Sequence, residues 1–180
     1  MVGNDIVDLA EARYASNWQR PRFLDKLFSE SEQTYIQNTA NPFRMVWRLW
    51  SIKEASYKLY TQLHPVRFYN PKAFECETNH NSWVVGFKDF QCYIETTETA
   101  NYILSEARLN RQNLGSNIIK FESTGQKQQS NELKERLLSC VADSYQLVKN
   151  EMGVPALTNG EQILSVSLTH HGSYGAFAIG

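Results

Sequence analysis

Apolar residues follow the spacing of strands in some segments of the chain and the spacing of helices in others. Residues 2–9 form a short apolar run interrupted by Asp5 and Asp8, which predicts a strand that carries two carboxylates. Asn41 and Pro42 predict the start of a helix, because asparagine caps free amide groups and proline lacks one. In chain order, this part predicts a strand at 2–9, a helical region at 22–28, a capping box joining Ser29 and Glu32, a helix from 41 to about 62, and strands at 83–87, 90–95 and 102–106.

A change in composition separates this part from the rest of the chain. Residues 110–129 are polar and rich in glycine, asparagine, glutamine and serine, which predicts a linker or a long surface loop. Residues 131–149 place leucines and valines near helical spacing and predict an amphipathic helix, and strands are expected at 162–169 and 174–179. Because the strands come in groups instead of alternating with helices, the predicted fold class is α+β, a single domain of antiparallel sheets packed with helices.

Composition excludes several classes of protein. The chain has 180 residues, the length of one domain or of two small halves packed together. Its formal net charge of -1 argues against a general nucleic-acid binder, and 42% hydrophobic residues argue against disorder. No apolar run is long enough for a membrane span, and the N-terminus lacks the basic start of a signal peptide. We therefore expect a cytoplasmic protein that binds neither nucleic acid nor membrane.

Glu54 lies at the centre of an aromatic face of the helix predicted at 41–62. At about 100° per residue, that face also carries four aromatic side chains between residues 43 and 57. A carboxylate buried there without a partner would cost several kcal/mol, so Glu54 needs a cation. Lys58, one turn further on, offers an internal salt bridge. The alternative is that Glu54 projects into a cleft and binds a metal ion.

Asp5 raises the same question in the predicted strand. Alternation with a period of two places it on the same face as Val7 and Leu9, among apolar side chains. Two carboxylates on buried faces, without a histidine cluster, suit a hard cation such as Mg²⁺, which commonly uses one or two protein carboxylates. Asp8 points to the opposite face, where it either supports the site or is exposed.

Basic and hydroxyl residues extend this pattern toward phosphate. Lys53 and Lys58 flank Glu54, and a second basic group lies at Arg20, Arg22 and Lys26. Lysines on both sides of a candidate metal ligand are typical of a diphosphate site, where Mg²⁺ bridges phosphate oxygens and ammonium groups neutralise the remaining charge. The segment from Ser167 to His170 ends a predicted strand with hydroxyls and an imidazole, and it is either a second phosphate contact or an ordinary hairpin turn.

Five segments resemble the motifs of 4'-phosphopantetheinyl transferases. The first three are VGNDIVDL at 2–9, RPRFLDKLFSESE at 20–32 and WSIKEASYK at 50–58, which match a G-x-D strand, an arginine-phenylalanine segment and a K-E helix in the family's order. The others are MGVPAL at 152–157 and SLTHHGSYGAFA at 167–178, which are similar to a G-x-P loop and a serine-histidine strand. The resemblance implies a 4'-phosphopantetheinyl transferase fold with two unequal, pseudo-symmetric halves.

The arrangement of these motifs differs from that of both known types. Residues 1–109 are similar to the second half of the larger, surfactin-synthetase-activating type, and residues 130–180 are similar to the end of its first half, with 110–129 between them. The larger type has a second acid two residues after the aspartate, where this chain has Val7. Water or Asp8 would then replace that metal ligand, as in the smaller holo-acyl-carrier-protein synthases.

The resemblance also implies roles for individual residues. Asp5 and Glu54 would hold Mg²⁺, and Glu54 with Lys58 would be catalytic. The substrate coenzyme A would contact Lys53, Lys58, Thr169 and His170, and a carrier protein would dock at Arg20 and Arg22. The implied reaction moves 4'-phosphopantetheine from coenzyme A to a serine of an acyl or peptidyl carrier protein. The alternatives left open are a degenerate protein that binds coenzyme A or a carrier protein without transfer, and either a monomer or a homo-oligomer such as a trimer.

Overall fold

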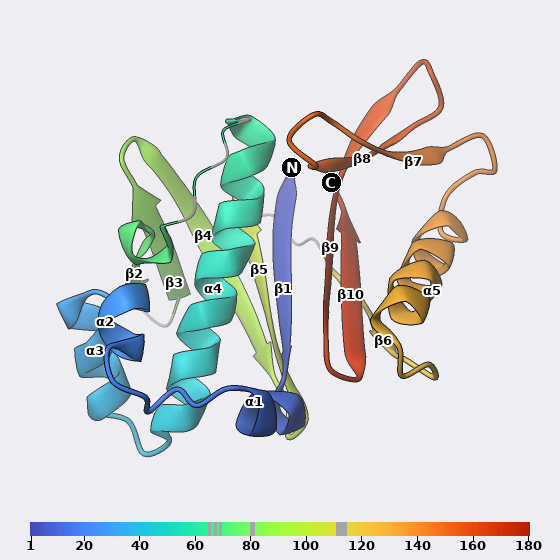
Figure 1. The fold of residues 1–180 in the computed structure, drawn as a ribbon. Helices are drawn as coiled ribbons and strands as arrows, with labels where there is room; N and C mark the ends of the chain where they lie inside the picture. Colours follow the sequence, from blue (N-terminus) through green and yellow to red (C-terminus); the bar gives the residue numbers. More distant parts are fainter. Residues whose placement is uncertain (65, 67, 69, 80–81, 111–114) are drawn as a thin grey trace.

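The computed structural model describes residues 1–64, 66, 68, 70–79, 82–110 and 115–180. Strands and helices form two side-by-side groups, with the N-terminal strand at the boundary between them (Figure 1). The elements are β1 (Val2–Asp8), α1 (Leu9–Ala15), α2 (Phe23–Leu27), α3 (Glu30–Gln37), α4 (Pro42–Leu63), the 3-10 turn η1 (Pro71–Ala73), β2 (Glu75–Asn79), β3 (Ser82–Phe87), β4 (Phe90–Glu98), β5 (Tyr102–Arg108), β6 (Asn117–Lys120), α5 (Gln126–Leu138), β7 (Gln146–Lys149), β8 (Pro155–Thr158), β9 (Ile163–His171) and β10 (Tyr174–Ile179).

The first group is a sheet covered by the long helix α4. The sheet has the strand order β1-β5-β4-β3-β2, and all neighbours are antiparallel. Asn41 caps α4 by accepting from the amide of Arg44, and Pro42 occupies its first turn, as the sequence predicts. Ser29 and Glu32 form the expected capping box of α3. The core between helix and sheet is apolar, with Val46, Leu49, Ile52, Leu59, Val85 and Ile103 among its fully buried members.

The second group is a smaller antiparallel sheet with α5 packed against it. Its strand order is β6-β10-β9-β8-β7, and its core contains Phe121, Leu133, Leu137, Leu157, Val166 and Phe177. The two sheets and the segregated helices confirm the α+β class. Within the described residues, no helix is both long enough and apolar enough to cross a membrane.

Hydrogen bonds from side chains join the two sheets. β1 lies beside β9 (Figure 1), and its outward amides donate to side chains of that strand instead of to its backbone. The amide of Asn4 donates to Ser167 Oγ at 2.9 Å, that of Ile6 to Thr169 Oγ1 at 3.2 Å and that of Asp8 to His171 Nδ1 at 3.0 Å. Three residues at alternate positions of β9 therefore accept hydrogen bonds from the amides on the outer edge of β1. Without them, these buried amides would lack partners.

Two expectations about the second half are wrong in detail. The range 110–129, expected to be a linker or a long surface loop, contains β6 and the first residues of α5, while residues 111–114 lie outside the described chain. The helix expected at 131–149 ends at Leu138, and the last four residues of that range form β7. Val141 and Leu147 pack against the same core as the helix, which explains why the apolar spacing continues after the helix has ended.

β1 approaches α4 very closely at Gly3. A Cβ atom built at this position would overlap the carbonyl oxygen of Ala55 and would lie 2.7 Å from the amide nitrogen of Leu59. Both neighbours are helix backbone, which cannot move aside as a flexible side chain can. Glycine is therefore required here for steric reasons, and the strand could not lie this close to the helix with any other residue.

Gly3→Ala is expected to destabilise the protein by about 1–3 kcal/mol, the usual cost of overpacking a core. Urea unfolding of the variant and the wild type measures this difference. Gly86→Ala is the matched control, because a Cβ atom at that strand position meets nothing within 4 Å. Equal stability of Gly3→Ala and wild type would show that the strand and the helix can separate without cost.

Candidate active site

Asp5 is held from both halves of the molecule. Its Oδ1 atom lies 2.9 Å from Lys58 Nζ on α4 and 2.9 Å from Thr169 Oγ1 on β9. Lys58 also donates to the carbonyl of Asn4 at 2.9 Å, so its ammonium group is bonded to two consecutive residues of β1. The strand, the helix and the second sheet therefore meet at this carboxylate.

Glu54 lies one helical turn before Lys58 and is partly buried. Burial raises its pKa to about 7, and the negative charge of Asp5 adds to this effect, while Lys58 partly opposes it. Lys58 forms its ion pair with Asp5, so the internal salt bridge considered for Glu54 and Lys58 is not the arrangement found. Two carboxylates thus share one site with one bonded ammonium group, and their mutual repulsion is not fully compensated.

This pair of carboxylates fits a divalent cation. No group of three or more histidine, cysteine, aspartate or glutamate residues suited to a metal occurs within the part of the chain that the structure describes. Mg²⁺ commonly keeps several water ligands and needs one or two protein carboxylates, which Asp5 and Glu54 provide. A cation between them would also offset the repulsion by Asp5, which adds to the effect of burial on the pKa of Glu54.

Asp8 serves another purpose and is buried, with 4% of its surface exposed. Its Oδ1 accepts from the amides of Ala10 and Glu11 and caps α1, and its Oδ2 accepts from the amide of Ser173. Because both oxygens are bonded to backbone amides on the opposite face of β1, Asp8 is neither exposed nor placed to replace the acid absent at Val7.

The structure does not bring Lys53 to the site. Its ammonium group is fully buried and lies 2.7 Å from Glu32 Oε1. It also donates to the carbonyl oxygens of Pro71 at 3.0 Å and Phe74 at 2.6 Å. All three donors of the ammonium group are therefore satisfied inside the core, and Lys53 has none left for a phosphate.

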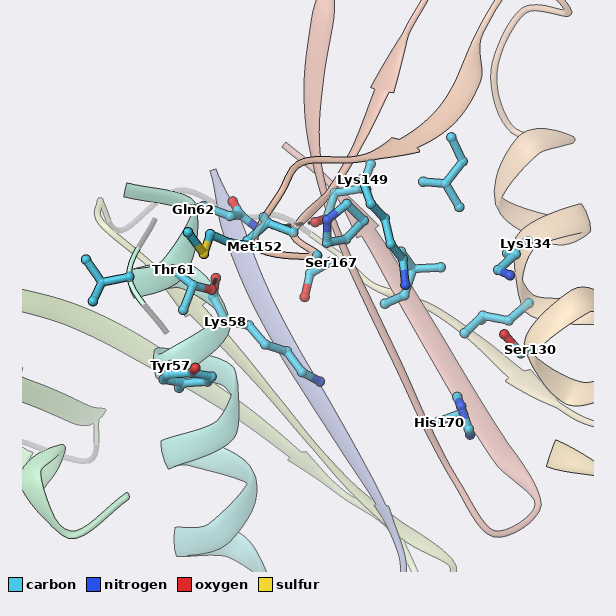
Figure 2. Close-up of a pocket in the computed structure, with 18 residues that line it drawn as sticks. Tyr57, Lys58, Thr61, Gln62, Ser130, Lys134, Lys149, Met152, Ser167 and His170 are labelled. Carbon is cyan, nitrogen blue, oxygen red and sulfur yellow. Dashed lines mark hydrogen bonds between the residues drawn. The ribbon is translucent and has the colours of Figure 1, made fainter. Parts of the chain in front are cut away.

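A pocket of about 450 Å³ opens between α4 and the second half of the chain. Lys58 extends into it from one side, and Lys134 of α5 and Lys149 of β7 reach it from the other (Figure 2). His170 also lines it, whereas Asp5, Glu54 and Thr169 are absent from its lining. Lys58 therefore connects the carboxylate pair to the pocket.

The loop expected from the G-x-P segment forms part of the pocket wall. Gly153, Val154 and Pro155 all line it, and Gly153 has a φ of 81°, in the left-handed region that favours glycine. Pro155 pairs with Lys149 across the β7–β8 hairpin, which brings this lysine beside the loop. Sequence reasoning missed Lys134 and Lys149; closeness to the loop motif was the one signal for Lys149.

His170 and His171 have different environments. Partial burial lowers the pKa of His170, and the charges of Lys58 and His171 lower it further. His170 is therefore neutral near pH 7 and offers the pocket a hydrogen-bonding group without adding charge. His171 instead accepts the amide of Asp8 at the junction of the two sheets.

The basic residues expected at 20–22 lie outside the pocket, on the surface between α1 and α2. Arg20 and Arg22 are both exposed. The guanidinium of Arg20 lies 5.1 Å from the ring centre of Phe23, and that of Arg13 lies 5.1 Å from the ring centre of Phe43. These cation–π contacts place two guanidinium groups over aromatic rings near the start of α4.

Lys58 thus links two carboxylates to a pocket that Lys134 and Lys149 also line. In comparison with known proteins, residues 1–110 match the 4'-phosphopantetheinyl transferase superfamily, and since this is more than half of the chain, the chain belongs to that superfamily. A segment of 58 residues is 40% identical to a holo-[acyl-carrier-protein] synthase of Campylobacter lari. That match covers 32% of this chain and 47% of the relative, so it spans about half of the relative's length.

Glu54 makes stability dependent on pH. Its pKa rises from 4.5 to about 7 on folding, so the folded state holds this proton more tightly than the unfolded chain does. The stability gained from the proton is complete below pH 4.5 and is lost as the pH rises through about 7. In metal-free buffer, Glu54→Gln should therefore gain stability relative to wild type between about pH 5 and about pH 8, by on the order of 2 kcal/mol.

Urea unfolding of both proteins at several pH values measures this difference. Glu161→Gln, at an exposed position, is the control and should follow the wild type. A stability difference between Glu54→Gln and wild type that stays constant across the range would mean that Glu54 ionises normally.

Proposed function

We propose that this protein transfers 4'-phosphopantetheine from coenzyme A to a serine of an acyl or peptidyl carrier protein, as holo-[acyl-carrier-protein] synthases do. The observation that carries the proposal is the pair of carboxylates, Asp5 and Glu54, joined through Lys58 to a lysine-lined pocket. Membership of the superfamily supports the reaction class, and the position of Lys58 beside both Asp5 and the pocket supports the roles proposed for these residues.

The pocket suits coenzyme A in size and charge. Its volume of about 450 Å³ lies within the usual range for small-molecule sites. Lys58, Lys134 and Lys149 supply three positive charges for the diphosphate and the 3'-phosphate. Leu133, Val154 and Pro155 provide apolar wall for the uncharged parts of the ligand. His170 adds a neutral imidazole at the pocket edge, where the resemblance expects a contact with coenzyme A.

Asp5 and Glu54 would hold Mg²⁺, which supplies charge neutralisation on the diphosphate when it is bound. Lys58 lies between the carboxylates and the pocket, where it stabilises negative charge on the phosphate oxygens. In the transfer, the serine Oγ forms a bond to the phosphorus next to pantetheine, and the bond from that phosphorus to the bridging oxygen breaks. The bridging oxygen leaves with 3',5'-ADP. Glu54 is proposed to accept the serine proton.

One chain supplies residues from both halves to the proposed site. Lys58 comes from the first half and His170 from the second, and both line the same pocket. We infer that a single chain forms a complete site, so that the protein acts as a monomer without a neighbour's histidine. An activity per chain that falls on dilution would favour the oligomer considered above.

Incubation with coenzyme A, Mg²⁺ and several apo-carrier proteins tests the proposed function. Mass spectrometry should detect the added phosphopantetheine on a carrier serine, and Asp5→Asn should reduce the rate by at least about 100-fold, because it removes one of the two carboxylates. Glu161→Gln should react as the wild type does. Binding of coenzyme A without a mass gain on any carrier would favour the degenerate, non-catalytic alternative.

The carrier protein is proposed to dock on the surface that contains Arg20 and Arg22. Carrier proteins of this kind are expected to be acidic, and both arginines are exposed beside α2. Arg22→Glu should raise the KM for the carrier about tenfold and leave kcat unchanged, because it repels the partner without touching the proposed site. Arg136→Glu, equally exposed but on α5, is the matched control. An unchanged KM for Arg22→Glu would rule out this docking surface.

A further inference from the structure

Thr169 is buried and does not face the pocket. It has 5% of its surface exposed, and its neighbours Leu168 and His170 line the pocket while Thr169 does not. Its side chain instead points to β1, where Oγ1 lies 3.2 Å from the amide nitrogen of Ile6 and 2.9 Å from Asp5 Oδ1. This geometry separates Thr169 from the coenzyme A contact that the resemblance implies for it.

The two contacts fix the orientation of the threonine hydroxyl. The backbone amide of Ile6 has a hydrogen to donate, so Thr169 Oγ1 accepts from it. A carboxylate can only accept, so the single hydroxyl hydrogen of Thr169 is donated to Asp5 Oδ1. A hydrogen bond to an ionised group is stronger than one between neutral groups, and here it is buried.

The bond determines which oxygen of Asp5 is available. Oδ1 accepts from Lys58 in the first half and from Thr169 in the second half, whereas Oδ2 has no hydrogen-bond partner among the described residues. Two donors from different elements thus fix the carboxylate plane and leave the second oxygen to a ligand. Removing either donor would let the Asp5 side chain rotate.

We propose that Thr169 is a positioning residue that holds Asp5 in the orientation needed to bind a divalent cation, and so makes cation binding depend on the second half of the chain. This inference rests on the proposed function only in taking Asp5 as a metal ligand. Thr169 should therefore affect the affinity for the cation and leave the affinity for the pocket ligand unchanged.

Ser167 provides a matched comparison. Its Oγ accepts from the amide of Asn4 at 2.9 Å across the same junction, as Thr169 accepts from that of Ile6. Unlike Thr169, Ser167 lines the pocket, and it has no hydrogen bond to Asp5 among the described residues. Ser167→Ala therefore removes one bond between the two sheets without touching the carboxylate. The difference between Ser167→Ala and Thr169→Val isolates the bond to Asp5 from the general loss of a bond at the junction.

Titration of the full chain with Mn²⁺ alone, followed by the electron paramagnetic resonance signal of the free ion, tests the proposal without any activity measurement. Thr169→Val should bind Mn²⁺ about 10- to 100-fold more weakly, the loss expected for a hydrogen bond to a charged group. Thr169→Ser, which retains the hydroxyl, should stay close to the wild type. Ser167→Ala should keep its Mn²⁺ affinity while its thermal unfolding temperature falls. Coenzyme A binding without metal should be the same in Thr169→Val and wild type.

Several outcomes would overturn the proposal. Wild-type affinity for Mn²⁺ in Thr169→Val would remove the positioning role and leave the metal site of the proposed function intact. Weakened coenzyme A binding with unchanged Mn²⁺ binding would make Thr169 a contact of the pocket ligand instead. A wild-type chain that binds no Mn²⁺ would overturn both this proposal and the metal site. If Thr169→Val does not fold, Thr169→Ala replaces it, and the same comparisons with Thr169→Ser and Ser167→Ala decide.

Discussion

β1 packs directly against the backbone of α4, and the positions of the site residues follow from this contact. Gly3 lets the strand lie directly against the helix backbone at Ala55 and Leu59. Because Asp5 follows two residues later on the same face of the strand, this approach brings its carboxylate within 2.9 Å of Lys58. The two residues of the G-x-D motif therefore act together. Gly3 permits the close packing of β1 on α4, and Asp5 forms the ion pair that this packing allows.

The other edge of β1 determines how the second half of the chain attaches. An edge strand presents unpaired amides, and here side chains at alternate positions of β9 satisfy them without extending the sheet. Since side chains span a greater distance than a backbone ladder, the two sheets remain separate and leave room for a pocket beside the junction. The strands that join the two halves, β1 and β9, therefore also lie beside the proposed site. On β9, Thr169 donates a hydrogen bond to the carboxylate of Asp5.

Local patterns predicted the parts of the molecule that local interactions determine. The start of β1 and the caps of α3 and α4 followed from spacing and residue type, whereas β1 ends one residue before its predicted end because α1 begins at Leu9. Spacing also singled out Asp5 and Glu54, whose role as metal ligands stays a prediction. Lys53 could not be placed in this way, because its partner Glu32 lies on another helix and lysines are usually exposed. Lys134 and Lys149 were missed for the same reason, since only the packing of α5 and β7 brings them beside α4. The end of α5 was misjudged because residues beyond it continue to pack on the same core.

Two carboxylates and three lysines are concentrated beside one another in the candidate site. Burial raises the pKa of Glu54 to about 7 and the charge of Asp5 adds to this effect, while three lysines reach one pocket from three different elements. The burial of Glu54 beside Asp5 does not stabilise the fold, because an ionised carboxylate is better solvated by water. In the proposed function, a divalent cation would reduce the repulsion between the two carboxylates, and phosphate groups would pair with the three lysines, of which Lys58 adjoins both ligands. A net charge of -1 thus conceals a site in which charges of each sign are concentrated side by side. The proposed function predicts that a cation and a polyanion bind to this site more tightly together than either does alone.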